Sequence, residues 1–261
     1  MKLRSAVVFL VSILLVAGCS DGSDRPVDSG QLSILVTNDD GIGSPGIDRL
    51  VNKLLAMDDV EIQVVAPAEN QSGSSDKTSE GDVVWQDSST ASGFAGVAVF
   101  GFPADAVKVA LEELGVTPDL VVSGVNQGQN VGPLAPLSGT VGAARFAARA
   151  GVPAVAASAG LSSSADFEAA ADLVVAWIED NRSALAGDSA DVDRITSFNV
   201  PGCTAGDIRE LVEVPRADSI PDGSNVFVTD CSVEPDSAPV SDVDAMIKGF
   251  AAVTQIPLDF Q

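Results

Sequence analysis

The 261-residue chain contains no histidine and only three cysteines. Without histidine it cannot form a Ser-His-Asp triad, a histidine-ligated zinc site or a phosphohistidine intermediate. The groups that remain for chemistry are carboxylates, amides and hydroxyls, and these suit hard cations such as Mg²⁺, Mn²⁺ or Ca²⁺.

Basic residues are also scarce, with 14 Lys and Arg against 37 Asp and Glu and a formal net charge of −23. Such a surface repels phosphate backbones, which argues against a partner made of DNA or RNA. We interpret the acidity as a solvation adaptation to salty surroundings. A consequence is that any anionic substrate needs a local cation in order to approach.

Long apolar runs are limited to the N-terminus, where residues 6–16 follow Lys2 and Arg4 and precede Cys19. The run is short for a membrane span, and its pattern is typical of a signal peptide. Residues 15–19, Leu-Val-Ala-Gly-Cys, resemble a bacterial lipobox, in which Cys19 is lipidated. An ordinary secretory signal with a chance cysteine is the alternative.

We therefore expect residues 1–18 to be a lipoprotein signal peptide and residues 19–31 to be a flexible tether rich in Ser, Gly and Asp. The lipid on Cys19 would be the only membrane contact and would hold the protein at the periplasmic face of a bacterial membrane or at the cell surface. Processing would leave 12 basic and 37 acidic residues, a net charge of −25.

The other two cysteines, Cys203 and Cys231, could pair in an oxidising compartment. Two buried free thiols are the alternative, and spacing alone does not decide between them.

After the tether, strand-like and helix-like segments alternate. We expect strands at 34–36, 60–67, 120–124, 154–158 and 195–200, and helices at 45–55, 103–114, 139–150 and 166–178. This order predicts an α/β fold, a three-layer α/β/α sandwich with a mainly parallel, Rossmann-like sheet. Residues 32–200 would form this core.

Two regions depart from the alternation. Residues 69–96 are rich in Ser, Gly, Asp and Thr and predict a long loop, with or without a weak hairpin, near the site. Residues 201–261 lose the helical pattern, and strand-like stretches at 208–214, 225–228 and 247–256 predict a C-terminal β arm. This arm would complete the core and make oligomer contacts.

The most informative segment is residues 34–41, where an apolar run ends in Asn38, Asp39, Asp40 and a glycine. A helical pattern follows, with Ser44 as its N-cap and proline at its first position. The two carboxylates thus lie on a turn after a buried strand, where ligands of parallel sheets bind. Adjacent carboxylates repel unless a proton or cation lies between them, and a divalent metal satisfies this condition.

Three more polar loops follow apolar segments, at residues 67–73, 123–132 and 137–140. In a parallel sheet these loops converge with Asp39 and Asp40 on one rim. Two carboxylates, a hydroxyl and an amide oxygen then form an oxygen-only cation site. The turn Ser138-Gly139-Thr140 presents free backbone N–H groups and the positive end of a helix dipole, which suit a phosphate group.

Several motifs occur together in a fixed order. They are residues 37–41 with 44–47, 65–67 with 70–73, 101–105, 118–128, 138–141, 198–201 and 249–258. This series resembles the SurE family, the survival-protein 5′/3′-nucleotidases, and the resemblance covers nearly everything after the tether.

The resemblance implies a metal-dependent phosphomonoesterase with an α/β/α core and a C-terminal arm used in a homodimer or tetramer. Matched residue by residue, it places the metal ligands at Asp39, Asp40, Ser72 and Asn126. The expected cofactor is one divalent cation, Mg²⁺ or Mn²⁺.

The predicted function is hydrolysis of small phosphomonoesters, nucleoside 5′/3′-monophosphates first. Asp39 or Asp40 would orient or deprotonate the attacking water or attack directly, and the sequence does not choose between these roles. Asn126 would act as ligand and phosphate contact. The remaining phosphate contacts would come from Asn38, Ser138, Gly139 and Thr140.

Two other functions remain open at the level of sequence. Paired Asp residues also serve metal–diphosphate sites, so a metal-dependent nucleotide-sugar transferase is one alternative. A catalytically silent lipoprotein that binds phosphate ligands is the other. Nucleotide-sugar turnover, or binding without turnover, would distinguish them.

Overall fold

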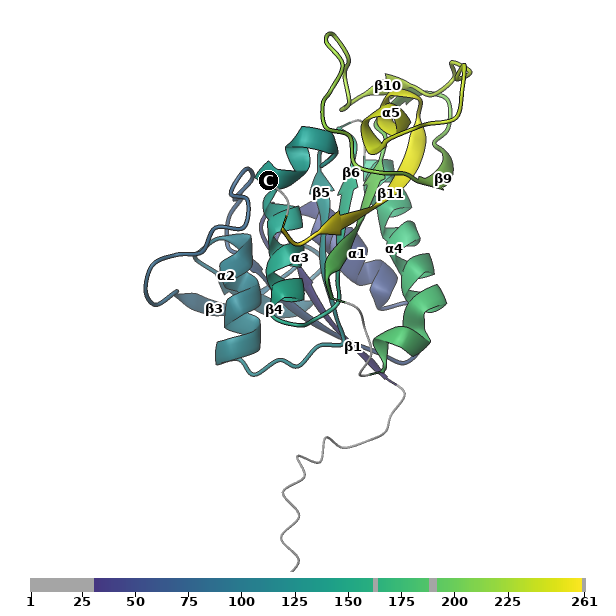
Figure 1. Ribbon diagram of the computed structural model, residues 1–261. Coiled ribbons are helices and arrows are strands. Elements are labelled where there is room, and N and C mark those ends of the chain that lie inside the picture. Colours follow the sequence, from purple (N-terminus) through teal and green to yellow (C-terminus); the bar gives the residue numbers. More distant parts are fainter. Residues whose placement is uncertain (1–30, 162–163, 188–191, 260–261) are drawn as a thin grey trace, which may run out of the picture.

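The computed structural model describes residues 31–161, 164–187 and 192–259, and most of its strands join one central sheet (Figure 1). The predicted signal peptide, Cys19 and the tether up to residue 30 lie outside the described residues. The strands are β1 (Leu32–Thr37), β2 (Val60–Pro67), β3 (Trp85–Ser89), β4 (Ala95–Val99), β5 (Leu120–Gln127), β6 (Ala154–Ala159), β7 (Arg194–Val200), β8 (Cys203–Ala205), β9 (Arg209–Glu213), β10 (Thr229–Asp230) and β11 (Phe250–Pro257).

The central sheet has nine strands in the order β3-β4-β2-β1-β5-β6-β7-β11-β9, and β8 pairs with β10 separately. From β4 to β7 in that order all neighbours are parallel. The strand β3 is antiparallel to β4, and β11 is antiparallel to β7. The predicted mainly parallel sheet is confirmed, and its carboxyl ends share one rim.

Helices cover both faces of the sheet (Figure 1). They are α1 (Pro45–Leu54), α2 (Pro103–Lys108), the π-helical η1 (Val109–Glu113), the 3₁₀-helical η2 (Gly132–Leu137), α3 (Gly139–Arg149), α4 (Ser164–Leu185) and α5 (Asp242–Ile247). On β1, Ile34 and Val36 share an apolar cluster with α1 and α4, whereas Leu35 joins α2 and α3. Successive residues of the strand therefore pack into two hydrophobic cores, one on each face of the sheet, which confirms the three-layer sandwich.

Two predicted helices differ from those observed. The helix expected at 103–114 is α-helical only to Lys108 and continues as a π-helix, whereas α4 runs beyond 178 to Leu185. In the described segments no helix combines the length and apolar character needed to cross a membrane.

Of the two alternatives predicted for residues 69–96, the structure shows the loop with a hairpin, formed by β3 and β4. The strand β4 pairs with β2, and β3 folds back on β4 as the edge of the sheet. Only the start of this region, around Ser72, reaches a pocket at the carboxyl ends of the parallel strands.

The C-terminal segment completes the sheet through β11, and its remaining elements gather at one end of the molecule (Figure 1). Residues of this segment, including Val226, Val243 and Phe250, share a third apolar cluster with Val131 of the core. A disulfide joins Cys203 to Cys231, with 5.4 Å between their Cα atoms, so the alternative of two free thiols is wrong.

Two C-terminal strand predictions need correction. Residues 225–228 form no strand, because the side chain of Asn225 accepts a hydrogen bond from the Phe227 N–H at 2.9 Å and turns the backbone. The strand expected from 247 begins at Phe250, since α5 precedes it and is capped by the Ser241 hydroxyl.

Candidate active site

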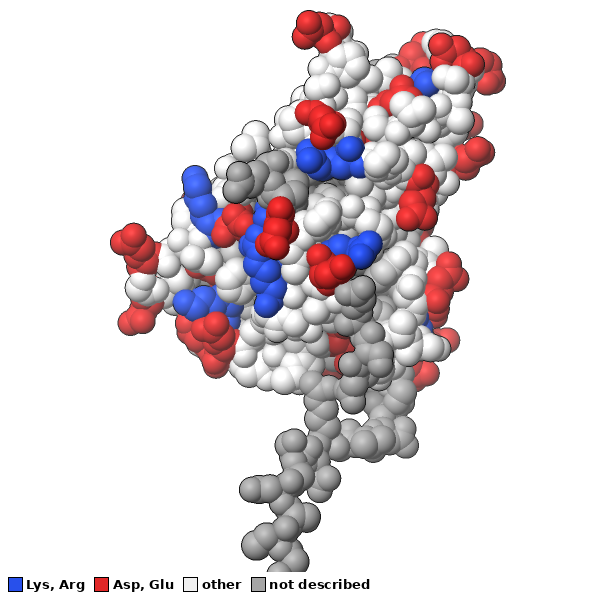
Figure 2. Space-filling view, in the orientation of Figure 1, with Lys and Arg blue, Asp and Glu red and all other residues white. Residues whose placement is uncertain are grey.

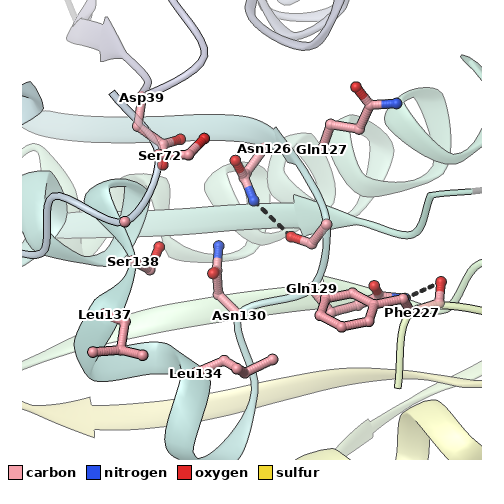
Figure 3. A pocket seen from close by; sticks show the side chains of 12 residues that line it. Asp39, Ser72, Asn126, Gln127, Gln129, Asn130, Leu134, Leu137, Ser138 and Phe227 are labelled. Carbon is pink, nitrogen blue, oxygen red and sulfur yellow. Dashed lines mark hydrogen bonds between the residues drawn. The ribbon is translucent and has the colours of Figure 1, made fainter. Parts of the chain in front are cut away.

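Loops that follow β1, β2 and β5 meet the N-terminus of α3 at the carboxyl rim of the sheet. Between them lies a pocket of about 200 Å³, lined on one side by Asp39, Ser72, Asn126 and Ser138 (Figure 3). The structure thus brings together residues that are far apart in the sequence, as the parallel topology predicted.

Asp39 is only 2% exposed and is held from the side of α3. The Thr140 hydroxyl donates to its Oδ1 at 2.6 Å. A Cβ on Gly139 would stand 2.8 Å from the Cβ of Asp39, so the helix can approach only because this residue is glycine. Burial, with a smaller contribution from the charge of Asp40, raises the pKa of Asp39 to about 6 against the lowering effect of Thr140.

Asp40 bridges two loops at the edge of the pocket and lines an adjoining hollow of about 170 Å³. Its Oδ1 accepts from the Asn70 side chain at 2.8 Å, and its Oδ2 accepts from the Gln127 backbone N–H at 3.0 Å. Burial raises the pKa of Asp40 even though both hydrogen bonds favour the charged form.

Hydrogen bonds from neighbouring residues fix the two neutral oxygen donors. The loop of Ser72 is tied to the turn after β1 by the Gln71 N–H, which donates to the Asp39 carbonyl at 2.7 Å. Asn126 Nδ2 donates to the Gly128 carbonyl at 2.6 Å. The amide oxygen of Asn126 is therefore the atom directed toward Ser72 and Asp39 (Figure 3).

The predicted phosphate contacts divide into two groups. Ser138 lines the pocket, and its hydroxyl also caps α3 by accepting from the Val141 N–H at 3.1 Å. Asn38 and Thr140 are fully buried beside the pocket and donate to protein atoms, Asn38 to Gly41 O and Ser44 Oγ. In this structure these two residues position the Asp39–Asp40 turn.

The donor set fits a hard divalent cation. Asp39, Ser72 and Asn126 direct oxygens toward one another (Figure 3). Asp40, the next residue in the chain, carries a second carboxylate that lines the adjoining hollow. Among the described residues no three His, Cys, Asp or Glu side chains form a group that could hold a metal ion by themselves. A cation here would accordingly depend on hydroxyl and amide oxygens as well as carboxylates, as Mg²⁺ and Mn²⁺ accept.

The sequence did not reveal the other side of the pocket. Leu134, Leu137 and Phe227 form an apolar wall, and Gln129 and Asn130 lie between this wall and the oxygen donors (Figure 3). Asn70 and Gln127 belong to two of the polar loops that the sequence predicted at the rim. Their hydrogen bonds to Asp40 could not be predicted from the sequence and are seen only in the structure. For Phe227 the sequence offered no signal, because its segment joins the rim only through tertiary contacts.

The fold and this rim define an α/β protein with an acidic, oxygen-rich ligand site at the carboxyl ends of parallel strands. Residues 34–218 match the family described as Survival protein SurE. The chain therefore belongs to the SurE family.

Individual relatives agree with this assignment. The chain is 33% identical over 240 residues to the 5′-nucleotidase SurE of Pseudoalteromonas atlantica, which covers 87% of this chain and 93% of the relative. It is 49% identical over 133 residues to the 5′-nucleotidase SurE of Halobacterium salinarum, but that match covers only 51% of this chain and 48% of the relative.

The fold has a solved counterpart in the SurE protein from Aquifex aeolicus. That structure aligns with a TM-score of 0.68 and 26% identity, covering 88% of this chain and 94% of the other.

Proposed function

We propose that this chain is a divalent-metal-dependent phosphomonoesterase that hydrolyses nucleoside 5′/3′-monophosphates. The observation that carries the proposal is the convergence of Asp39, Ser72 and Asn126 beside Ser138 at the N-terminus of α3. Similarity to relatives named 5′-nucleotidase SurE supports the reaction class.

The residues of the site have separable roles in this proposal. A bound Mg²⁺ or Mn²⁺ would supply charge to attract the phosphate and to favour ionised water. Burial raises the pKa of Asp39 to about 6 in the metal-free protein. A bound cation would favour the ionised carboxylate, which would accept a hydrogen bond or a proton from the attacking water. Asn126 presents its amide oxygen to the pocket, and the backbone at Gly139 offers the positive end of α3 to an anion.

The first test is hydrolysis of AMP and p-nitrophenyl phosphate by the purified chain with Mg²⁺, with Mn²⁺ and with EDTA. We expect turnover with at least one metal and loss of turnover in EDTA, restored when metal is added back. Nucleotide-sugar cleavage without AMP hydrolysis would instead favour a transferase, and AMP binding without turnover would favour a silent binding protein.

We further propose that the protein is lipid-anchored through Cys19 and faces the periplasm or the outside of the cell. The lipobox-like residues 15–19 support this proposal. The Cys203–Cys231 disulfide adds support, because disulfides persist in oxidising compartments.

Replacing Cys19 with Ser should abolish incorporation of labelled fatty acid and leave an unprocessed or released protein. The reason is that the thiol is the lipid acceptor and becomes the first residue after cleavage. Labelling in cells, followed by membrane fractionation, measures the effect, and Cys203→Ser provides a cysteine control that should keep the label. Fatty acid incorporation that persists in the Cys19→Ser protein would contradict the anchor.

The proposed partners are small phosphomonoesters and a second copy of the chain in a homodimer or tetramer. Exposed apolar side chains of the C-terminal segment, namely Leu211, Val233 and Val240, support the oligomer. We propose no nucleic acid polymer as partner. Acidic side chains are spread over the face seen in Figure 2, and the basic ones there lie close to acidic neighbours.

A further inference from the structure

The pocket has two ends of different chemistry. The end near Asp39 offers oxygen donors and a helix N-terminus, which suit a cation and a phosphate group. The other end offers Phe227, whose ring projects from the C-terminal segment into the pocket (Figure 3). The residue as a whole is 38% exposed. A ligand that fills both ends needs a phosphate at one side and a flat apolar group at the other.

The backbone of Phe227 is held closely against the rim. Its carbonyl accepts from the Gln129 side chain at 3.3 Å and from the Leu161 N–H at 3.4 Å. A Cβ on Gly202 would stand 2.5 Å from this carbonyl oxygen, so the segment after β7 can lie here only with glycine at that position. Phe227 is therefore fixed relative to the strands that carry the site.

The disulfide closes the segment that carries Phe227. Cys203 follows Gly202 directly, and its partner Cys231 comes four residues after Phe227 and is only 4% exposed. Beside the disulfide, β8 pairs with β10. The Thr229 N–H also donates to the Gly202 carbonyl at 2.9 Å. The covalent link thus restrains the loop of residues 204–230, whose far end places the ring in the pocket.

We propose that Phe227 is the stacking platform for the nucleobase of the substrate and that the Cys203–Cys231 disulfide positions it. This inference rests on the proposed nucleotidase function and adds a determinant of substrate specificity. Every nucleobase has a π-face that stacks on an aromatic ring, whereas a simple sugar phosphate has none. Phe227 therefore favours nucleoside monophosphates over phosphomonoesters of aliphatic alcohols.

The test compares AMP with ribose 5-phosphate in Phe227→Leu, Phe227→Trp and wild-type protein. Base stacking of the usual strength predicts that Phe227→Leu raises KM for AMP on the order of tenfold, with kcat unchanged. The ribose 5-phosphate constants should not move, and Phe227→Trp should retain the wild-type KM for AMP. Phe100→Leu is the matched control, since that phenylalanine is 53% exposed and outside the pocket.

The double variant Cys203→Ala, Cys231→Ala should raise KM for AMP in the same selective way, because the loop that carries Phe227 loses its covalent restraint. An equal decrease in kcat/KM for AMP and for ribose 5-phosphate in Phe227→Leu would overturn the proposal and indicate a structural role. A changed oligomeric state of Phe227→Leu in analytical ultracentrifugation would overturn it in favour of a subunit contact.

Binding of adenosine in EDTA separates this proposal from the proposed reaction. Adenosine has the base without the phosphate, and isothermal titration calorimetry needs neither metal nor turnover. Weaker adenosine binding by Phe227→Leu supports the platform even if wild-type protein hydrolyses no phosphomonoester, a result that would refute the proposed reaction alone. Equal adenosine affinity in both proteins, or adenosine binding by neither, would refute the platform.

Discussion

Asp40→Asn is expected to lower kcat/KM for AMP by a factor on the order of 10³ or more, because the site would lose one of the two charged cation ligands that we propose. Both oxygens of Asp40 accept hydrogen bonds, one from Asn70 and one from Gln127. The asparagine side chain keeps one accepting oxygen, but its NH₂ group donates and cannot accept a hydrogen bond. The variant therefore also loses one of the two contacts between loops. Steady-state kinetics at several Mn²⁺ concentrations will measure both turnover and the metal requirement.

The matched control is Asp48→Asn. Asp48 lies on α1 outside the pocket and accepts from the Ser92 N–H at 2.7 Å. Its kcat/KM should equal that of wild type, which separates the effect of the site from a general loss of negative charge. Full activity of Asp40→Asn, with circular dichroism showing an intact fold, would exclude the site described above.

Asp39→Asn should stabilise the metal-free protein at neutral pH by up to about 3 kcal/mol, the free energy that corresponds to a pKa raised from 3.8 to about 6. The folded state holds the proton of Asp39 more tightly than the unfolded chain. The resulting stabilisation is therefore complete below pH 3.8 and disappears as the pH rises through about 6. An amide in place of the carboxyl carries no such pH dependence.

The measurement is the free energy of unfolding in urea, with EDTA, for wild type and Asp39→Asn between about pH 4.5 and about pH 7.5. The difference in the free energy of unfolding between Asp39→Asn and wild type should grow as the pH rises. Mg²⁺ should reduce this difference, because it stabilises only the wild type. A pH-independent difference would contradict the argument.

Asp76→Asn provides a control of opposite sign. Burial tends to raise the pKa of Asp76, but the hydrogen bond from Arg149 and the charges of Arg145 and Arg149 outweigh it and hold the pKa below its ordinary value. Because a lowered pKa stabilises the folded state above the ordinary pKa, Asp76→Asn should be less stable than wild type at neutral pH.

The strands of the core could be predicted because their sequences carry the signal locally. The run of residues 60–67 is mostly apolar, with Glu61 and Gln63 at alternate positions, ends in proline and matches β2 residue for residue. Likewise the turn of Asp39 and Asp40, placed between an apolar run and a helix that begins with proline, lies at the rim as predicted. Ser44 occupies the predicted N-cap position, but its hydroxyl accepts from Asn38 and makes no bond to the helix backbone. Both features depend on neighbours in sequence.

Features that depend on distant partners were predicted only in part or missed. For residues 69–96 the sequence left open a long loop with or without a weak hairpin, and only the pairing of β4 with β2 on one side and β3 on the other shows the hairpin as the edge of the central sheet. The position of Phe227 depends on its contacts with Gly202 and Gln129, which are distant in the sequence. No local sequence pattern indicates these contacts. By contrast α5 had a local signal, Ser241 followed by Asp242 and Asp244 in a first turn, that the strand interpretation overlooked.

The close fit of Gly139 against Asp39 has a consequence for the entropy of ligand binding. The Asp39 side chain has little rotational freedom, because the backbone of α3 blocks one side and the Thr140 hydroxyl fixes one oxygen. Immobilising a free side chain on binding typically costs about 0.5–1.5 kcal/mol. For Asp39 this loss of freedom occurs during folding, so a cation bound as we propose would meet a ligand that is already ordered.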